Sequence, residues 1–418
     1  MDKLVITGQK RLSGEVTISG AKNAAVAVIP AAIMSGDICT IENLPYIEDV
    51  ECLVEILTSM GAKCEFIEKH TLKIDSRGIK NLPADYDAVK KIRASYYLLG
   101  ALLGRFKEAE VAWPGGCNFG GRPIDQHIKG FEALGAEVKV EHGMIIAKAE
   151  KLEGNNIYLD MASVGATINI MLAAVLAKGR TTIENAAKEP HVVDTANFLN
   201  IMGANIKGAG TDVIRIEGVE KLHGCSYMII PDQIEAGTYM IAGAITGGDV
   251  TVKNIIPKHM ESLSAKLSEM GAEIEEGDDW INVKTNIPLK GVNVKTMYYP
   301  GFPTDLQPQM VALLATSSGV SLVTENVFNN RFQYVNELKR LGANIIVEDR
   351  VAVINGVPEF SGAEVMATDL RAGVALVISA LAAKGKVTIG NVKYIDRGYE
   401  YIEEKLRSIG ASIQRVEE

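Results

Sequence analysis

The sequence predicts an α/β protein built from six repeated units of about 70 residues, each holding a helix, a glycine stop and β-strands. The first observation is a tripeptide, Met, Leu or Ile followed by Gly and Ala, that occurs six times. Its glycines are separated by 74, 68, 68, 71 and 68 residues, which is too regular for chance recurrence of a common helix-stop motif. The six glycines are Gly61, Gly135, Gly203, Gly271, Gly342 and Gly410.

A second marker, a glycine-led strand that ends in Asn, runs in phase with the first. In the second unit this marker should fall at Glu110–Pro114, where the sequence is strand-like but has no Asn. The other copies span residues 37–43, 180–185, 249–254, 320–326 and 386–391.

Within a unit, an amphipathic helix such as Leu263–Met270 precedes the tripeptide, and an alternating strand such as Asn344–Val347 follows it. Glycine ends the helix because it accepts positive φ. The last unit stops after one strand, Ser412–Val416, whereas other units continue with a second strand. Lys3–Ile6 offers the missing strand, so we expect the N-terminal strand to complete the last unit and the two chain ends to lie together.

Composition limits the classes of function. A chain of 418 residues is expected to form two domains. The net charge of −9 argues against nucleic acid as a partner. The longest apolar run, Ala24–Met34, is too short to span a membrane and contains Pro30. Five cysteines without paired spacing and no signal-peptide pattern favour a reducing cytoplasm. No metal-ligand cluster, Walker loop or dinucleotide fingerprint indicates a cofactor.

Counting 21 residues back from each Asn marker reaches the expected start of a helix. Because helix N-termini bind anions, several such ends aimed at one place would suit phosphate and carboxylate groups. Lys22, Arg93 and Arg371 at these starts favour that interpretation over solvated surface charges. The predicted starts are Lys22, Arg93, Val164 or Gly165, Gln233 or Ile234, Asp305, and Leu370 or Arg371.

Thr304, Asp305, Thr368 and Asp369 could instead be helix caps. Capping is the favoured role for Asp369. The prolines on either side of Asp305 indicate a fixed backbone, which leaves a catalytic role open there.

The segment 113–123 has four glycines in seven positions and reads as a loop with Cys117 at its tip. A thiol five residues from Arg122 is a candidate reactive group. The alternative, a small buried hydrophobe, suits Cys39 and Cys52 better. Polar segments that follow marker strands are either part of a site or ordinary helix-capping loops. They span residues 184–190, 325–331 and 394–399.

Five motifs together resemble the enolpyruvyl transferases, and among them the UDP-N-acetylglucosamine 1-carboxyvinyltransferases. They are residues 19–25, the Cys117 loop 115–123, and residues 302–305, 368–372 and 396–399. The resemblance covers essentially the whole chain. The cysteine loop beside Arg122 and Pro123 separates it from the similar shikimate-pathway transferases.

The resemblance implies a two-domain inside-out α/β barrel with three units per domain, sheets outside and helices buried. One domain would span residues 22–229, and the other residues 1–21 plus 230–418. It implies transfer of the enolpyruvyl group of phosphoenolpyruvate to the 3′-hydroxyl of UDP-N-acetylglucosamine, with release of phosphate, at the first committed step of peptidoglycan precursor synthesis. These small molecules are the expected partners, with no cofactor, no metal, no nucleic acid and no membrane. Inactivation by the epoxide fosfomycin is also implied.

By the match, Cys117 donates the proton and forms an adduct with phosphoenolpyruvate, and Asp305 is the candidate base. Lys22, Arg122 and Arg397 would hold its phosphate and Arg371 its carboxylate, with Arg93 also contacting ligand. Positions matching a UDP-sugar site are Asn23, Arg122, Pro123, Ile124, Asp125, Gln126, Ser163, Val164, Gly165, Asp305 and Val327.

Two alternatives remain. A non-catalytic repeat scaffold should carry similar residues at equivalent positions, whereas the helix starts Lys22, Gly165 and Asp305 are chemically diverse. A shikimate-type transferase is disfavoured by the Cys117 loop.

Overall fold

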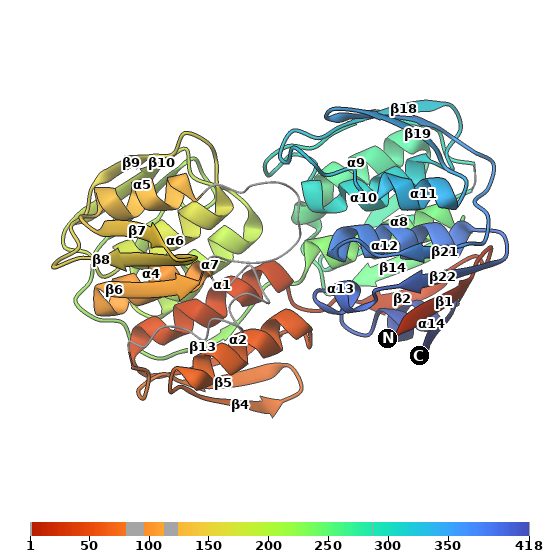
Figure 1. The fold of residues 1–418 in the computed structure, drawn as a ribbon. Helices are drawn as coiled ribbons and strands as arrows, with labels where there is room; N and C mark the ends of the chain where they lie inside the picture. The colour runs from red at the N-terminus through yellow and green to blue at the C-terminus, as the bar shows by residue number, and fades with distance from the viewer. Residues whose placement is uncertain (1, 81–95, 113–123, 287, 418) are drawn as a thin grey trace. The chain divides into compact units, whose positions relative to one another are not determined.

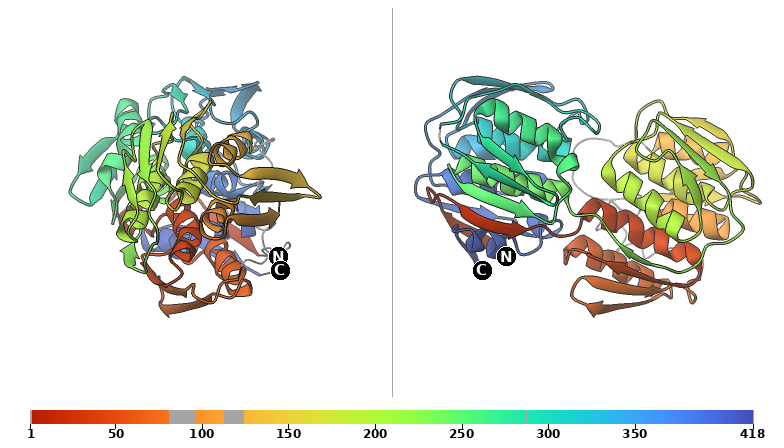
Figure 2. Two further views of the ribbon diagram at one scale, coloured as in Figure 1. Left: turned by 90° about the vertical axis from the view of Figure 1, so that its left-hand side faces the viewer. Right: turned by 180° about the vertical axis from the view of Figure 1, so that it is seen from behind.

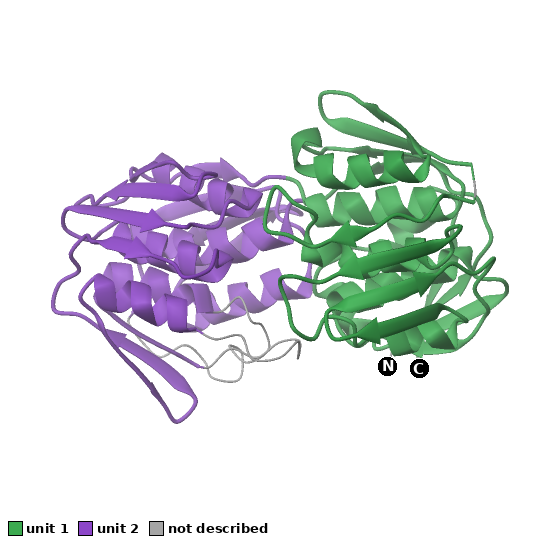
Figure 3. Cartoon of the chain, turned by 90° about the horizontal axis from the view of Figure 1, so that it is seen from above, with its two compact units in different colours: residues 1–19, 117–120, 231–418 green, residues 20–116, 121–230 purple. Residues whose placement is uncertain are grey.

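The computed structural model describes residues 2–80, 96–112, 124–286 and 288–417. These residues form two compact units (Figures 1 and 3). Unit 2 contains the described residues from 20 to 230, and unit 1 contains residues 2–19 together with those from 231 to 417. The chain therefore passes between the units at residues 19–20 and again at 230–231.

The helices of unit 2 include three that are apolar around most of their circumference, namely α1, α4 and α6. A helix of this kind is stable only when it is surrounded by other elements, and these three are buried along nearly their whole length. The helices are α1 (Lys22–Ala32), α2 (Glu48–Ser59), α4 (Tyr97–Phe106), α5 (Asp125–Ala133), α6 (Val164–Ala174) and α7 (Pro190–Ile201).

Three sheets of unit 2 flank these helices, in the orders β13-β3-β5-β4, β6-β8-β7 and β11-β12-β10-β9. Several of their strands alternate buried and exposed residues, so one face of each sheet packs on the core. The strands are β3 (Ile38–Glu42), β4 (Lys63–Glu68), β5 (Thr71–Asp75), β6 (Glu108–Ala112), β7 (Glu137–Glu141), β8 (Met144–Lys148), β9 (Asn156–Tyr158), β10 (Arg180–Glu184), β11 (Asn205–Lys207), β12 (Val213–Glu217) and β13 (Ser226–Met228).

Unit 1 repeats this plan, with α8, α10 and α12 as its buried helices. The helices are α8 (Gln233–Ile245), α9 (Glu261–Met270), α10 (Gln307–Leu314), α11 (Val335–Arg340), α12 (Leu370–Ala382), α13 (Lys393–Asp396) and α14 (Ile402–Ser408), with short 3-10 turns η3 (Pro257–Met260) and η4 (Thr304–Leu306).

The sheets of unit 1 have the orders β15-β16-β14-β2, β17-β18-β20-β19 and β21-β22-β1-β23. Their strands are β1 (Lys3–Thr7), β2 (Ser13–Thr17), β14 (Asp249–Lys253), β15 (Glu273–Glu276), β16 (Trp280–Lys284), β17 (Val294–Lys295), β18 (Val320–Thr324), β19 (Asn344–Glu348), β20 (Val351–Asn355), β21 (Glu364–Met366), β22 (Lys386–Gly390) and β23 (Ser412–Val416).

The N-terminal strand completes the last sheet, as the truncated last unit predicts. β1 lies between β22 and β23 and is antiparallel to both, with Val5 opposite Thr388 on one side and Gln414 on the other. Both views of Figure 2 show the two ends side by side. Leu4 and Ile6 of β1 are fully buried, so this closure contributes to the core of unit 1.

Both repeated markers have a conformational cause. All six tripeptide glycines have φ between 94° and 103°, a region that favours glycine. Asn43, Asn185, Asn254 and Asn391 have φ between 56° and 60°, which asparagine tolerates better than most residues. Each of these four amides also donates to a backbone carbonyl on a neighbouring segment, at 2.8 to 3.2 Å. The Asn therefore ends the strand and ties it to the next segment.

The predicted helix starts agree with the structure at Lys22, Val164, Gln233 and Leu370. Asp305 lies instead in the turn η4, two residues before α10. Residues 394–396 of the polar segment 394–399 belong to the short helix α13. Within the described ranges, no helix combines the length and apolar character needed to cross a membrane.

Candidate active site

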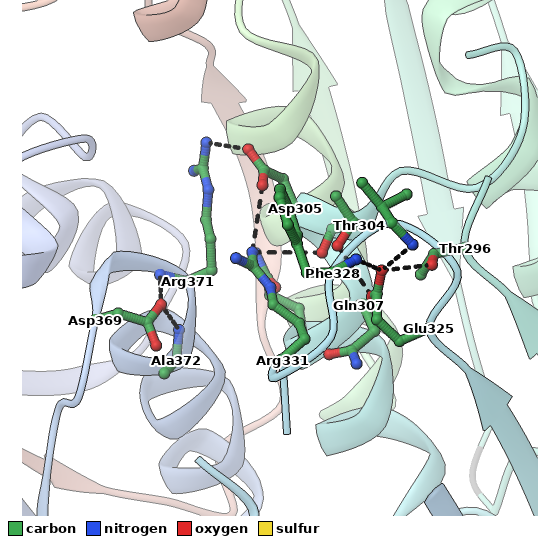
Figure 4. Close-up of polar contacts among 12 residues, drawn as sticks. Thr296, Thr304, Asp305, Gln307, Glu325, Phe328, Arg331, Asp369, Arg371 and Ala372 are labelled. Atoms are coloured by element: carbon green, nitrogen blue, oxygen red, sulfur yellow. Dashed lines mark hydrogen bonds and ion pairs between the residues drawn. The ribbon is translucent and has the colours of Figure 1, made fainter. Parts of the chain in front are cut away.

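Asp305 is held between two arginine side chains in unit 1 (Figure 4). Its Oδ2 lies 3.0 Å from Nη2 of Arg371, and its Oδ1 lies 3.3 Å from Nη2 of Arg331. The Asp305 side chain is 27% exposed, whereas those of Arg371 and Arg331 are 5% and 2% exposed. The carboxylate is thus the accessible member of a largely buried ion-pair cluster.

Two helix starts bring this cluster together. Asp305 follows Pro303 in η4, which leads into α10, and Arg371 occupies the first turn of α12. Asp369 caps α12, since its Oδ1 accepts hydrogen bonds from the N–H groups of Arg371 at 3.0 Å and Ala372 at 3.1 Å. The predicted capping role of Asp369 is confirmed, while the carboxylate of Asp305 binds two arginines.

Arg371 is a buried cation, so the alternative of a solvated surface charge is wrong for this residue. Burial acts to lower the pKa of its guanidinium, but Asp305, Tyr399 and Asp232 together outweigh this effect, so the pKa is raised above its usual value. The Tyr399 hydroxyl lies 3.4 Å from Nη1 of Arg371 and 2.8 Å from the Thr238 hydroxyl. These contacts hold the guanidinium in one orientation.

A buried carboxylate, Glu325, ties the loop after β18 to the turn that carries Asp305. It accepts hydrogen bonds from the hydroxyls of Thr296 and Thr304, both at 2.9 Å. It also accepts from the N–H groups of Val327 at 2.8 Å and Phe328 at 3.1 Å. The predicted residue Val327 therefore belongs to the loop that leads to Arg331, and this loop is anchored beside Asp305.

Arg397 lies in the same unit, directly after α13, and is partly buried. The neighbouring Asp396 binds Arg415 of β23 through both carboxylate oxygens, at 2.7 and 3.0 Å. This pair fixes α13 against the last strand and so fixes the backbone from which Arg397 extends.

In unit 2, Lys22 is the first residue of α1, and its Nζ lies 2.6 Å from Oδ2 of Asp49 on α2. The two side chains are 11% and 2% exposed, so the alternative of a solvated surface charge is wrong for Lys22 as well. From the sequence, we expect an anion beside Lys22. Among the described residues, the Asp49 carboxylate takes that place. Asn23 follows in α1 and is partly buried.

The starts of α5 and α6 adjoin each other in unit 2. The Gln126 side chain of α5 donates to Asp160 at 3.0 Å and accepts from its N–H at 2.9 Å. Ser163 caps α6 by accepting from the Ala166 N–H at 3.3 Å. A Cβ on Gly165 would lie 2.6 Å from the Tyr96 hydroxyl, so glycine at this position allows the Tyr96 side chain to lie against the start of α6.

Ile124 precedes α5 and is buried, whereas Asp125 is exposed and accepts from the Gln126 amide at 2.9 Å. Val164 is the first residue of α6. The structure thus brings the predicted positions 124–126 and 163–165 to two neighbouring helix starts. Arg93, Cys117, Arg122 and Pro123 lie outside the described residues.

Three residues of these clusters were missed by reasoning from the sequence: Asp49, Arg331 and Tyr399. Arg331 and Tyr399 are the last residues of the polar segments 325–331 and 394–399. Their place in these segments was the only sequence feature that could have pointed to them. Asp49 belongs to an acidic helix start and carried no signal beyond that.

The chemistry of the Asp305 cluster follows from its composition. Guanidinium groups bind carboxylates and phosphates through paired N–H donors. An accessible carboxylate between two buried arginines can accept a proton from a bound hydroxyl, and an anionic ligand can compete with it for the arginines. The cluster is therefore suited to an anionic substrate whose reaction includes a proton transfer.

Comparison with known proteins places these clusters in a family. The family model described as EPSP synthase (3-phosphoshikimate 1-carboxyvinyltransferase) matches residues 6–406. A Clostridium acetobutylicum protein named UDP-N-acetylglucosamine 1-carboxyvinyltransferase 2 is 60% identical over 416 residues, which cover 99% of both chains. The Clostridium botulinum protein named UDP-N-acetylglucosamine 1-carboxyvinyltransferase is 60% identical over 417 residues, covering 100% of both.

Solved structures agree on the fold. The enolpyruvyl transferase NikO from Streptomyces tendae has a TM-score of 0.90 at 28% identity and covers 99% of each chain. EPSP synthase from Acinetobacter baumannii has a TM-score of 0.76 at 21% identity and covers 100% of each chain, a likeness of fold alone.

Proposed function

Because the chain belongs to the EPSP synthase family of carboxyvinyltransferases, we propose that it transfers the enolpyruvyl group of phosphoenolpyruvate to the 3′-hydroxyl of UDP-N-acetylglucosamine and releases phosphate. One observation carries the choice of acceptor: full-length relatives that are 60% identical are named for this sugar nucleotide. The product is a precursor of peptidoglycan.

The reaction adds the sugar hydroxyl to C2 of the enol and a proton to C3. Phosphate then leaves from C2 and a proton leaves from C3, which restores the double bond. Asp305 is the base that takes the hydroxyl proton. Its support is geometric, because this carboxylate is accessible while the arginines that offset its charge are buried. Arg331 and Arg371 fix both of its oxygens, so the carboxylate is oriented before substrate binds.

The proton for C3 comes from the thiol of Cys117, which also forms a covalent adduct with phosphoenolpyruvate. This role rests on the match of the glycine-rich loop 113–123 to the family motif, since a thiol in such a loop beside Arg122 is suited to reaction.

Cationic side chains hold the two charged groups of phosphoenolpyruvate. Arg371 binds its carboxylate, and support comes from the present partner of Arg371, which is itself a carboxylate at 3.0 Å. Lys22, Arg122 and Arg397 bind the phosphate and Arg93 contacts ligand, in accordance with the family motifs. Clamps of this kind stabilise the leaving phosphate as its charge develops.

The sugar nucleotide is held by positions at the starts of α5 and α6, with Asn23, Asp305 and Val327. Support comes from the contacts that fix the α5 start to Asp160. The remaining positions are Arg122, Pro123, Ile124, Asp125, Gln126, Ser163 and Val164.

We further propose that the fold is a six-unit inside-out barrel, with one domain of residues 22–229 and a second of residues 1–21 and 230–418. The six sheets of the described residues and the buried helices in both units support it. The enzyme works in the cytoplasm, where the free thiols of the described cysteines persist.

The test is phosphate release with both substrates present. Release that requires UDP-N-acetylglucosamine as well as phosphoenolpyruvate, with a product mass equal to the sum of the two minus phosphoric acid, supports the proposal. Release that requires shikimate 3-phosphate instead would show that the chain uses the other acceptor of its family. A protein that is folded by circular dichroism and releases phosphate with neither acceptor would contradict a catalytic role.

A further inference from the structure

Two cysteines of unit 2 stand opposite each other on neighbouring parallel strands. Cys39 lies in β3, and Cys225 directly precedes β13. Ser226 is paired with Thr40 in the parallel register, and the Thr40 N–H donates to the Cys225 carbonyl at 2.8 Å. One step back in this register sets Cys225 against Cys39, with both side chains on the same face of the sheet.

The backbones are held close at this point. A Cβ on Gly224 would lie 2.0 Å from the carbonyl oxygen of Ile38, so only glycine permits the approach of the two chains one residue before the cysteines. Neighbouring strands are about 4.8 Å apart, and a disulfide accepts Cα separations of about 4.4–6.8 Å. The register therefore places the two thiols within the geometric range of a bond.

Each thiol changes the pKa of the other. The Cys225 side chain is the main cause that lowers the pKa of Cys39 to about 7, and the Cys39 side chain is the main cause that raises the pKa of Cys225. Cys39 is fully buried and also contacts the Ser35 hydroxyl at 3.7 Å, whereas Cys225 is partly exposed. An oxidant from solvent thus meets Cys225, with Cys39 behind it as the resolving thiol.

We propose that Cys39 and Cys225 form a reversible disulfide when the protein meets a peroxide, so that the pair is a redox-sensitive staple between β3 and β13. The Cys225 sulfur attacks one peroxide oxygen, its proton passes to the Cys39 thiolate, and the other oxygen leaves as hydroxide. Cys39 then attacks the Cys225 sulfenic acid, the S–S bond forms and water leaves. The hydroxide takes up the proton that Cys39 first lost to solvent, so in total two thiols and one hydrogen peroxide give one disulfide and two waters.

The staple acts on a segment that leads from one unit to the other. After β13, Ile229 donates to the Glu42 carbonyl at 3.2 Å, and the Ile230 carbonyl accepts from the Ala21 N–H at 2.7 Å. Residue 230 is the last of unit 2 before the chain passes to unit 1. A disulfide at Cys225 would add a covalent bond to the hydrogen bonds that attach this segment to β3. The bond would last while conditions are oxidising. A thiol reductant restores the free pair.

Peptide mapping tests the bond directly. The full-length protein with Cys117→Ser, which removes the candidate reactive thiol, is treated with hydrogen peroxide, and free thiols are alkylated. Cleavage after Lys, Arg and Glu isolates Cys39 in peptide 23–42 and Cys225 in peptide 222–235, apart from Cys52. We expect these two peptides joined, two hydrogens lighter than their sum, and separated again by dithiothreitol. Recovery of both as alkylated thiols at a peroxide dose that oxidises Cys64 would overturn the proposal.

Thermal unfolding tests the staple. Because the bond would close a long loop in the unfolded chain, oxidation should raise the unfolding midpoint of unit 2 by roughly 5 °C. Cys64→Ser, at a partly exposed thiol of β4, is the matched control and should keep the shift, whereas Cys225→Ser should lose it. A joined peptide without a rise in the midpoint would contradict a restraining role, as would an equal rise in Cys225→Ser.

Discussion

Asp305 and its two arginines illustrate how a single side chain can be both accessible and fixed. Each oxygen of the carboxylate has its own guanidinium partner, from α12 on one side and from the loop after β18 on the other. Charged pairs of this kind are costly to bury unless the geometry is good. Here the carboxylate keeps access to solvent while its partners do not, an arrangement suited to a group that exchanges protons.

Replacing Asp305 by Asn should test its role as the base. The amide keeps the shape and one acceptor but cannot take a proton, so kcat should fall by about 10²–10⁴-fold. Initial rates of phosphate release at saturating substrates measure this. Asp278→Asn, at an exposed turn between β15 and β16, is the matched control and should leave kcat unchanged. A kcat within about threefold of the parent with a raised KM would limit Asp305 to substrate binding.

The thiol of Cys117 should be the target of fosfomycin. We expect the epoxide to inactivate the enzyme and to add its mass to the peptide that carries Cys117. The variant Cys117→Asp can still supply a proton, so it should retain activity and resist the epoxide, and Cys117→Ser should be much less active. Modification of another cysteine with loss of activity would argue against the assignment.

The candidate residues could be predicted where the signal is local. Lys22 and Arg371 stand at helix starts that the repeat locates, and Asp369 fits a capping pattern, so each could be found by periodicity. Arg331 could not, because its role comes from a contact with Asp305, which is 26 positions away and separated from it by α10 and β18. Asp49 is similar, since nothing near it in the sequence indicates that α2 presents it to Lys22.

At the scale of elements, repeated strands end in a positive-φ Asn whose amide also binds a neighbouring segment. A separate contact, between the buried Asp194 and the partly buried Tyr227, joins α7 to β13. The Tyr227 hydroxyl of β13 donates to Asp194 Oδ1 of α7 at 2.6 Å, and the N–H of Ile230 donates to Oδ2 at 3.4 Å. Burial is the main cause that raises the pKa of Asp194 from 3.8 to about 6.

This pair predicts a pH dependence of stability. Between pH 3.8 and about 6 the folded state keeps a proton on Asp194 that the unfolded chain has lost, so stability falls as pH rises through this window. The contribution amounts to about 3 kcal/mol at most. Asp194→Asn should remove it, so that its stability relative to the parent improves between pH 4 and pH 7.

Urea unfolding of both proteins across this range measures the difference. Asp212→Asn, at an exposed position of the same unit, is the control and should follow the parent. A parallel pH profile for Asp194→Asn and the parent would contradict the prediction.

The helices and strands could be predicted because the residues that end them recur at regular positions in the sequence. The tripeptide glycines all adopt positive φ, and four of the five Asn markers do so as well. The fifth, Asn326, instead donates its amide to the sulfur of Met297, and that unit's helix begins with a 3-10 turn. Local sequence did not reveal this difference, since it accompanies the hydrogen bonds that Glu325 accepts from Thr296 and Thr304 in other segments.

At the scale of the molecule, the closing strand β1 joins the beginning and the end of the chain in one sheet. It supplies the middle strand between β22 and β23 and buries Leu4 and Ile6. The chain ends lie together, with Lys3 opposite Val416. A circular permutant should therefore fold when a short Gly-Ser linker joins the ends and new ends open at the exposed turn 278–279.

We expect this permutant to unfold within a few degrees of the parent and to keep its activity. Deletion of residues 2–8 should instead lower the unfolding midpoint strongly, because two strands lose their partner and apolar core residues are removed. Circular dichroism on heating compares the proteins. A deletion variant as stable as the parent would show that β1 is not needed for the sheet.

Insertion of unit 2 between β2 and the rest of unit 1 has a consequence during synthesis. The ribosome makes β1 first, yet its partners β22 and β23 emerge about 20–80 s later at ordinary translation rates. During that interval unit 2 can fold, because its residues are contiguous in the chain. The nascent β1 meanwhile has exposed Leu and Ile side chains and backbone N–H and C=O groups without strand partners. A chaperone that shelters short apolar segments near the start of a nascent chain would raise the yield of this protein more than that of one whose first strand pairs at once.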